Sequence, residues 1–327
     1  MADDIWTVRR ILEWIEGYLA QHGDDKPRAS AQWLVSEALG VSKMQLFIDL
    51  ERPLTPEERT TLRDYTRRRA AGEPLQYITG TVDFRHITVK VRPGVLIPRP
   101  ETEVLVSEAL ALLPAAEKPQ GALDREVLAQ LAELGEIEAG DLPDLPSEEA
   151  LLVADICTGS GCVACSIAYE HPHTRILATD ISPDAIALAA ENRSDLGLDN
   201  RIELFECDLG EGIDRALLGT FDLVVSNPPY IPTDELSTLS AEVSDYEPAL
   251  ALDGGADGLD VFRRLLAWCE LALKPGGAFA FELHETCLDT AADEAGRAGF
   301  CEIRTISDLA GRPRVLTGRA AGKATVR

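Results

Sequence analysis

The sequence predicts an α/β protein in which a mostly parallel sheet, covered by helices on both faces, follows a small N-terminal helical bundle. Two patterns carry this prediction. After Leu151, short apolar segments alternate with helical ones, which is typical of a parallel sheet. Over residues 1–75, apolar side chains recur at helical spacing instead. The 327 residues are enough for two domains, each with its own core.

The end of the helical bundle is marked by a change of period. Within the bundle, the stretch TPEE at 55–58 predicts a helix start, because a threonine N-cap followed three residues later by glutamate forms a capping box. From Gly80 the apolar period becomes two, over 81–84 and 87–91, which predicts a hairpin. We assign this hairpin to a linker at residues 76–100.

The second predicted domain spans residues 101–327. The stretch PRPE at 98–101 opens its first helix, since proline and acidic residues suit a helix N-terminus. Residues 114–149 then break the apolar pattern, with ten acids against two basic residues. This composition predicts an exposed, partly disordered insert with one helix near 123–134. Five strands follow, which read LLVADIC, RILATD, RIELFECD, FDLVVSN and GAFAFEL.

Composition limits the classes of partner. A net charge of -25 argues against binding to nucleic acid, which needs a basic surface. The one basic cluster, Arg67–Arg69, is short and suits a solvated helix face better than a nucleic-acid site. The N-terminus carries no export signal, and no apolar stretch has the length of a membrane span. We therefore expect a cytoplasmic protein with no membrane partner, and we expect a monomer.

The seven cysteines are scattered through apolar segments, which predicts reduced, buried thiols rather than a disulfide framework. Cys157, Cys162 and Cys165 lie close together in the sequence. A metal site would want a fourth ligand, and the nearest histidines, His171 and His173, lie in a loop after the intervening helix. We therefore predict no metal.

A glycine loop, TGSG at 158–161, joins the strand LLVADIC to a helix that begins at Cys162. Glycines at such a turn let the backbone approach a ligand, and the helix N-terminus offers unpaired N–H groups. The run GSGCVA followed by Asp180 also fits a relaxed dinucleotide fingerprint. Taken alone, the loop is a weak signal.

Three acids near the ends of successive strands favour a positively charged ligand. Asp155 lies just before the glycine loop, Asp180 ends the second strand and Asp208 the third. Asp155 would repel a pyrophosphate but attract a sulfonium, while Asp180 can hold a ribose diol and Asp208 can reach a base. The set suits S-adenosylmethionine better than NAD. Each acid also suits a helix cap or a surface charge, Asp180 above all, because Ser182-Pro183 follows it.

The strand FDLVVSN ends in the tetrad NPPY at 227–230. A turn is the simplest interpretation, since asparagine and proline favour turns. Open α/β sheets bind ligands at the carboxyl ends of their strands, so the position of the tetrad favours a ligand site instead.

The chain resembles a class I S-adenosylmethionine-dependent methyltransferase in four stretches. In order, they read DICTGSG, ATDISPDAIALAAEN, ECDL and SNPPYI. Specifically, they resemble the PrmC/HemK family of protein-(glutamine-N5) methyltransferases, which act on peptide chain release factors. The resemblance extends over nearly the whole chain, because four further stretches share it: GEPLQYITG, VLIPRPETE, YEPALAL and DLAGRPRVLTGR. It implies a seven-stranded Rossmann-like sheet, S-adenosyl-L-methionine as cofactor, an N-terminal domain that docks the substrate, and methylation of the glutamine in the Gly-Gly-Gln motif of a release factor.

The resemblance also implies roles for single residues. Along the methionine part of the cofactor it places the loop residues Cys157, Thr158, Gly159, Ser160 and Gly161. It places Asp180 at the ribose, and Asp208 and Leu209 by the adenine. Around the substrate glutamine it places the tetrad, Asn227, Pro228, Pro229 and Tyr230. Asn227 and Asp155 join the cofactor set, and Arg99 and Glu101 of PRPETE join the substrate set. The family loop usually begins with glycine. Cys157 in that place would crowd the cofactor or require a negative φ.

The tetrad suits the chemistry of amide methylation. A carboxamide nitrogen is a poor nucleophile, so an enzyme helps by accepting both of its N–H hydrogens and holding it in line with the methyl group. Asn227 offers a side-chain oxygen, and Pro228 offers a carbonyl that Pro229 restricts to one direction. Tyr230 would stack on the amide and place π density near the sulfonium. Asn227, Pro228 and Tyr230 are therefore the predicted catalytic residues.

Other classes of function stay open at this point. An adenine-N6 nucleic-acid methyltransferase carries a similar tetrad, but the charge of -25 and the lack of a basic recognition region count against it. Cys157, which stands where the family has glycine, suggests a non-catalytic binding protein that keeps the methyltransferase fold. An NAD dehydrogenase would leave NPPY unexplained.

Overall fold

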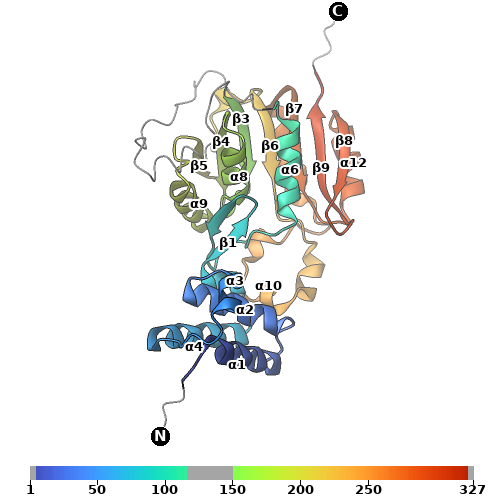
Figure 1. Cartoon of the computed structure of the whole chain (residues 1–327). Helices are drawn as coiled ribbons and strands as arrows, with labels where there is room; N and C mark the ends of the chain where they lie inside the picture. Colours follow the sequence, from blue (N-terminus) through green and yellow to red (C-terminus); the bar gives the residue numbers. More distant parts are fainter. Residues whose placement is uncertain (1–4, 116–149, 323–327) are drawn as a thin grey trace, which may run out of the picture.

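The computed structural model describes residues 5–115 and 150–322. Almost all of the predicted acidic insert at 114–149, together with its expected helix, therefore lies outside the described residues. Figure 1 shows a large sheet with its helices, a group of N-terminal helices below it, and a small hairpin between the two.

Five helices form the described N-terminal part: α1 Val8–Gln21, α2 Pro27–Leu39, α3 Lys43–Ile48, α4 Pro56–Ala70 and α5 Leu75–Thr79. They share one apolar core, in which Ile15, Leu34 and Leu62 are buried. The predicted capping box at the start of α4 is present, since the Thr55 hydroxyl accepts from the Glu58 amide and the Glu58 carboxylate accepts from the Thr55 amide at 2.8 Å. Helices α3 and α5 were not predicted, because six and five residues are too few to show an apolar period.

The hairpin and the helix after it follow the sequence pattern closely. Strands β1 Thr81–Phe84 and β2 Ile87–Lys90 pair antiparallel. Helix α6 runs over Thr102–Leu112, directly after the PRPE stretch. Its apolar side packs on the sheet and buries Leu105, which is fully enclosed.

The sheet has seven strands in the order β5-β4-β3-β6-β7-β9-β8. Their bounds are β3 Leu151–Ile156, β4 Thr174–Asp180, β5 Ile202–Glu206, β6 Phe221–Ser226, β7 Leu273–Glu282, β8 Phe300–Ser307 and β9 Pro313–Ala320. The first five in this order pair parallel, whereas β9 runs antiparallel to both of its neighbours. The seven-stranded, mostly parallel fold is confirmed. The apolar pattern did not show β8 or β9. Strand β8 is an edge strand with mostly exposed side chains, and only four apolar residues interrupt the polar ones in β9.

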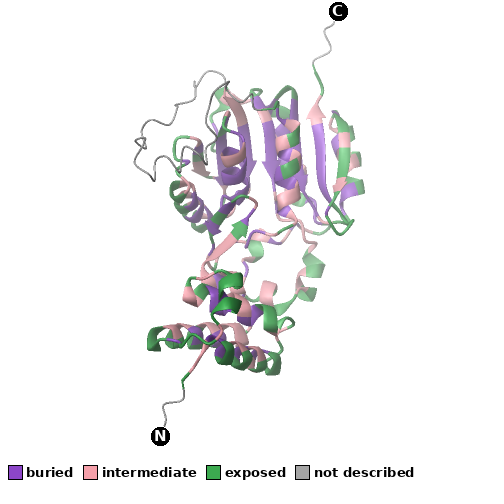
Figure 2. Cartoon of the chain, in the orientation of Figure 1, coloured by how far each residue is buried: buried purple, intermediate pink, exposed green. Residues whose placement is uncertain are grey.

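Helices cover both faces of the sheet, which is why its central strands are buried throughout (Figure 2). On one face lie α6 and α8 Cys162–Glu170, with α9 Pro183–Asp195 beside them near β5. On the other face lie α11 Asp260–Ala272 and α12 Leu288–Arg297. No helix within 5–115 or 150–322 is long and apolar enough to cross a membrane.

The segment between β6 and α11 reaches from the sheet to the N-terminal helices. It contains the short helices η3 Thr233–Thr238, α10 Ala241–Ser244 and η4 Ala249–Ala251. Arg69 at the end of α4 forms ion pairs with Glu242 at 3.0 Å and with Asp24 at 2.7 Å. The Tyr246 hydroxyl donates to the Ala71 carbonyl at 2.9 Å. These bonds attach the segment to the end of α4.

We predict that Arg69→Ala lowers the free energy of unfolding by about 3 kcal/mol, because it leaves the buried Asp24 carboxylate, whose side chain is 3% exposed, without its cation. Arg67→Ala on the same helix is the matched control. Arg67 pairs with Asp64 while 77% exposed, so its loss should cost less than about 0.5 kcal/mol. Urea denaturation measures both values, and equal effects would contradict the prediction.

Candidate functional site

The carboxyl ends of β3 to β7 meet at one edge of the sheet, which faces the N-terminal helices (Figure 1). The glycine loop follows β3, and Asp180 ends β4. Asp208 follows β5, the NPPY tetrad follows β6, and Glu282 ends β7. The structure thus brings the predicted cofactor and tetrad residues to the same edge, in the order of the strands.

The glycine loop depends on backbone conformations that suit glycine. Gly159 and Gly161 have φ of 56° and 78°, in the left-handed region. Gly161 also faces α9 closely, since a Cβ there would lie 3.1 Å from the Ala189 Cβ. The Gly161 amide donates to the Thr158 carbonyl at 2.8 Å, and α8 begins at the next residue. The loop therefore presents its backbone at the helix N-terminus, where a ligand can approach.

Asp155 lies under this loop and holds it to α8. Its Oδ2 accepts from the Thr158 hydroxyl at 2.6 Å and from the Ala164 amide at 3.1 Å. Burial raises the pKa of the Asp155 carboxyl to about 7, although these two hydrogen bonds lower it. A positive charge nearby would favour the ionised form of such a carboxyl.

Asp180 connects the ends of two strands. Its Oδ2 accepts from the Gly159 amide and its Oδ1 from the Ser182 amide, both at 2.9 Å. Burial raises the pKa of the Asp180 carboxyl, and these amide hydrogen bonds oppose the rise. Ser182, not Asp180, is the N-cap of α9, so the helix-cap interpretation of Asp180 is wrong. Each carboxylate oxygen keeps a second lone pair that can accept from a ribose hydroxyl.

Asp208 and Leu209 lie at the outer part of the same edge. Asp208 forms an ion pair with Arg264 of α11 at 2.6 Å, with its side chain 36% exposed. Leu209 is buried and has φ of 46°, a strained value for leucine. The surrounding apolar cluster holds Leu209 in this conformation, directly after Asp208 in the chain.

Cys157 does not meet the expectation of a negative φ. Its φ is 61°, so it adopts the conformation of the glycine that it replaces. A non-glycine residue in this region carries a strain of about 1 to 2 kcal/mol. Burial raises the pKa of the Cys157 thiol, so the thiol stays protonated. The loop thus takes a left-handed conformation at a cysteine whose thiol is neutral.

The tetrad does not form a turn, since residues 227–230 have no regular or turn structure. Asn227 donates from Nδ2 to the Thr102 hydroxyl at 3.2 Å, and the Tyr230 hydroxyl donates to Glu282 at 3.0 Å. Two glycines pack against the tyrosine backbone, because a Cβ on Gly254 or Gly258 would lie within 2.7 Å of it. The simplest interpretation of NPPY, a strand-ending turn, is wrong.

A small cavity of 40 Å³ lies between the glycine loop and the first residue of the tetrad. Its lining includes Asp155, the loop residues Cys157 to Ser160, and Asn227. The opposite wall comes from residues 96–99 and from Thr102. The glycine loop and Asn227, the first residue of the tetrad, thus border a common space. The other three tetrad residues and the predicted cofactor residues Asp180, Asp208 and Leu209 do not line it.

Arg99 and Glu101 have different surroundings. Arg99 lines the small cavity and forms an ion pair with the buried Glu247 of the YEPALAL stretch, which also accepts from the Ile97 amide. Glu101 pairs with Arg312 at 3.3 Å and lines neither the small cavity nor the groove described next. The structure therefore places Arg99, but not Glu101, at the predicted site.

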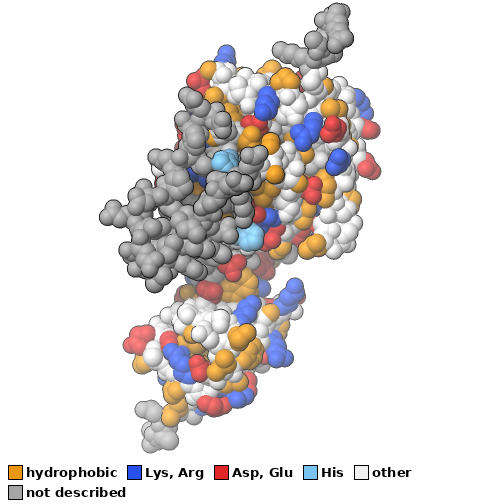
Figure 3. Space-filling model, turned by 45° about the horizontal axis from the view of Figure 1, so that its top comes forward, with side chains coloured by type: hydrophobic (Ala, Val, Ile, Leu, Met, Phe, Trp, Pro, Cys, Tyr) orange, Lys and Arg blue, Asp and Glu red, His pale blue; other side chains and the backbone are white. Residues whose placement is uncertain are grey.

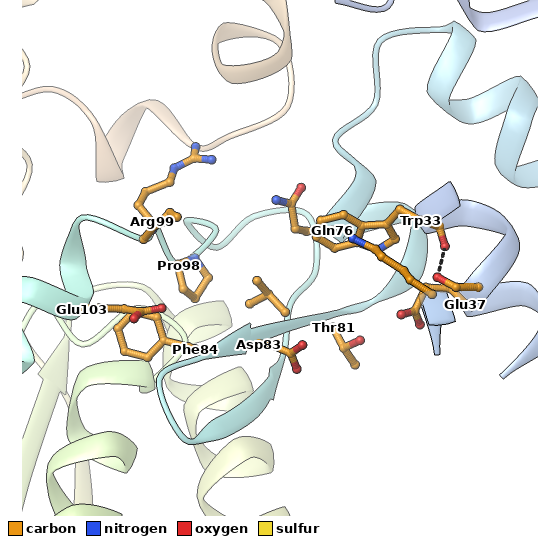
Figure 4. A pocket seen from close by; sticks show the side chains of 13 residues that line it. Trp33, Glu37, Gln76, Thr81, Asp83, Phe84, Pro98, Arg99 and Glu103 are labelled. Atoms are coloured by element: carbon orange, nitrogen blue, oxygen red, sulfur yellow. Dashed lines mark hydrogen bonds between the residues drawn. The ribbon is translucent and has the colours of Figure 1, made fainter. Parts of the chain in front are cut away.

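A groove of 330 Å³ leads from this region to the N-terminal helices (Figure 4). Trp33 and Glu37 of α2 form one end, and Pro98, Arg99 and Glu103 form the other, with β1 between them. Because Pro98 and Arg99 also line the small cavity, the groove and the cavity meet at this stretch.

Three residues near the tetrad were not predicted: Thr102, Glu247 and Glu282. All three are polar side chains that are at most 6% exposed. The signal for Glu282 was an acid at the end of the apolar run GAFAFEL, the same pattern that identified Asp180. Within 5–115 and 150–322, no group of three or more His, Cys, Asp or Glu is arranged to hold a metal ion.

Comparisons with known proteins identify the family of this chain. The PrmC N-terminal domain matches residues 10–80, and the methyltransferase small domain matches residues 142–243. The release factor glutamine methyltransferase of Geobacter sulfurreducens is 40% identical, over 97% of this chain and 98% of that protein. This chain belongs to the release factor glutamine methyltransferase family. The relative from Rhodopirellula baltica, 35% identical over 98% of both chains, carries the same name.

Among solved structures, the ribosomal protein L11 methylase from Lactobacillus delbrueckii subsp. bulgaricus is 24% identical, with a TM-score of 0.38 over 59% of this chain and 78% of that one. This likeness is too distant to add to the argument. In a member of the release factor glutamine methyltransferase family, the loop at 158–161 belongs to a methyltransferase domain, so the dinucleotide fingerprint does not indicate a dehydrogenase.

We predict that Cys157→Val lowers the free energy of unfolding by about 2 kcal/mol, because a β-branched side chain tolerates a positive φ less well than cysteine. Cys157→Gly is the matched control. There the relief of strain offsets the greater freedom of glycine in the unfolded chain, so stability should change by less than about 1 kcal/mol. Chemical denaturation compares the two. A valine variant as stable as the wild type would show that the loop conformation is not strained.

Proposed function

We propose that this protein transfers a methyl group from S-adenosyl-L-methionine to the side-chain amide nitrogen of a glutamine in a protein, namely the Gly-Gly-Gln motif of a peptide chain release factor. One observation carries the proposal: Asn227 and the glycine loop line the same small cavity. Family membership supports the same reaction. The reaction belongs in the cytoplasm, where release factors act.

The residues at the sheet edge fit a sulfonium nucleoside. Asp155, Asp180 and Asp208 place three carboxylates along the site, and the glycine loop offers its backbone between them. We assign Cys157 to Gly161 to the methionine part, Asp180 to the ribose, and Asp208 with Leu209 to the adenine. The carboxylates favour the positive charge of this cofactor, which supplies an activated methyl group when bound.

Asn227, Pro228 and Tyr230 hold the acceptor in this proposal. The Asn227 side-chain oxygen and the Pro228 carbonyl accept the two N–H hydrogens of the glutamine amide and stabilise the positive charge that develops on its nitrogen. The Pro228 ring fixes its own φ and Pro229 restricts Pro228 to an extended ψ, so the Pro228 carbonyl keeps its direction. The Tyr230 ring is anchored at its hydroxyl by Glu282 and stacks on the planar amide. Placement is the main source of rate, because no strong base is required.

The protein substrate docks, we infer, along the groove and on helix α3. Exposed apolar side chains gather on α3, where Met44 is 76%, Phe47 48% and Ile48 73% exposed. The same helix supplies Lys43 to the groove. An apolar surface of this kind next to a groove is typical of a protein-binding site. A docked protein could extend a loop through the groove to the cavity at Asn227.

A nucleic-acid substrate has no comparable support. On the face seen in Figure 3, Lys and Arg side chains are interspersed with Asp and Glu and form no broad basic patch. The net charge is -25, and proteins that grip phosphate backbones present a basic surface.

We predict that the wild type labels the glutamine of a Gly-Gly-Gln motif when incubated with labelled S-adenosylmethionine and a release factor. Asn227→Ala should lower kcat by about 100-fold or more, because one acceptor for the developing charge is lost. Asn200→Ala, at an exposed position before β5, serves as the control with full activity. Absence of label from wild type that binds the cofactor in calorimetry would refute the proposal.

Changing the apolar surface of α3 tests the docking surface separately. The double variant Met44→Asp with Ile48→Asp should raise KM for the release factor by about tenfold, since burying a charged side chain in an apolar contact costs more than about 1 kcal/mol. The value of kcat and the affinity for S-adenosylmethionine should not change. Leu271→Asp on α11 is the matched control, because Leu271 is 63% exposed just before the amino end of β7. Equal KM values for both variants would exclude α3 from docking.

A further inference from the structure

The small cavity beside the glycine loop has one charge of each sign in its lining. Among the described residues that line it, Asp155 and Arg99 are the charged ones. Asp155 ends in the space under the glycine loop, whereas Arg99 belongs to the segment 96–99, which comes from another part of the chain. A small ligand with a cationic and an anionic group therefore has a partner of opposite charge for each group in this lining.

Asp155 has an oxygen that can accept from a cation. The residue is 1% exposed, and its two hydrogen bonds, from the Thr158 hydroxyl and the Ala164 amide, both end on Oδ2. Oδ1 accepts from none of the residues that the structure describes. A carboxylate oxygen accepts about two hydrogen bonds, so Oδ1 is available to a donor of a ligand in the cavity.

Arg99 has donors that can bind an anion. Its Nη2 forms the ion pair with Glu247, and no other hydrogen bond or ion pair joins Arg99 to the described residues. A guanidinium carries five N–H donors in a planar fork, so it can bind a second carboxylate at another edge. The Arg99 side chain is 34% exposed, which leaves its remaining donors within reach of a ligand.

Glu247 holds this guanidinium in place. Its side chain is 1% exposed, and its two oxygens contact the same segment, because Oε1 pairs with Arg99 and Oε2 accepts from the Ile97 amide at 3.3 Å. Ile97 and Arg99 both line the cavity. A buried carboxylate thus fixes a long side chain before a ligand binds, which lowers the entropy that binding costs.

We propose that Arg99 binds the carboxylate of the methionine part of S-adenosyl-L-methionine, while Asp155 binds the ammonium group. The methionine end of this cofactor carries one group of each charge on the same carbon, which matches the two charges of the lining. The inference rests on the cofactor of the proposed function. It moves Arg99 from the substrate set, to which the resemblance assigned it, to the cofactor set, and it makes Glu247 a positioning residue.

The test measures the binding of two ligands to the full chain by calorimetry, without a release factor. S-adenosyl-L-methionine carries the carboxylate, and its decarboxylated form lacks only that group. Arg99→Met removes the guanidinium but keeps a long side chain. Arg92→Met is the matched control, because Arg92 is 39% exposed, pairs with Glu191 at 2.7 Å, and lines neither the cavity nor the groove.

We expect Arg99→Met to bind S-adenosyl-L-methionine about 30-fold more weakly than wild type, the effect of losing one charged hydrogen-bonded contact. The same variant should bind the decarboxylated form within about threefold of wild type, because that ligand makes no contact with the guanidinium. Arg92→Met should bind both ligands as wild type does. Equal losses for the two ligands, or wild-type cofactor affinity with a raised KM for the release factor, would overturn the inference.

A second variant covers the case in which Arg99→Met does not fold, because that change leaves the buried Glu247 carboxylate without its cation. Arg99→Met with Glu247→Gln removes both charges, and we expect the same difference between the two ligands. A double variant that binds S-adenosyl-L-methionine as tightly as wild type overturns the inference equally. A wild type that binds this cofactor but labels no release factor overturns the proposed function instead.

Discussion

The site depends on the parallel pairing of β3 with β6. In this register Ile156 lies opposite Ser226, and the Ser226 hydroxyl donates to the Ile156 carbonyl at 2.6 Å. Both residues are fully buried. Because neighbouring strands lie about 4.8 Å apart, the glycine loop and the NPPY tetrad begin side by side. A slip of one residue would move each side chain of the strand into the core on the opposite face, where the packing fits a different side chain, so close packing on both faces protects this register.

Acidic side chains organise the edge of the sheet before any ligand arrives. Asp155 holds the start of α8, and Asp180 holds the glycine loop to the end of β4. Glu282 holds the tetrad, because it accepts a hydrogen bond from the Tyr230 hydroxyl. A site whose polar groups are already oriented loses little free energy on binding, because few side chains need to be ordered. The strained conformations of Cys157 and Leu209 fit this picture, since strain persists only where the surrounding structure holds it.

The segment after the tetrad connects the chemistry to the N-terminal helices. Glu242 and Tyr246 bind the end of α4, and Glu247 binds Arg99 beside the small cavity. In our proposal, a protein that docks on α3 and in the groove contacts elements that are joined to the segment after the tetrad by ion pairs and a hydrogen bond. This arrangement gives a reason for the YEPALAL stretch, which makes no contribution to the core of the sheet.

The sequence by itself determined the elements and the residue types of the site. Apolar periods marked five strands and most helices, the capping box marked the start of α4, and polar residues at strand ends marked Asp180, Asp208 and Asn227. These signals are local, because they depend on spacing along one segment. Only the tertiary structure decided how Cys157 fits the loop, that Glu101 turns toward Arg312, and that Thr102 and Glu282 hold the tetrad. Those outcomes depend on contacts between segments far apart in the chain, which no local pattern records.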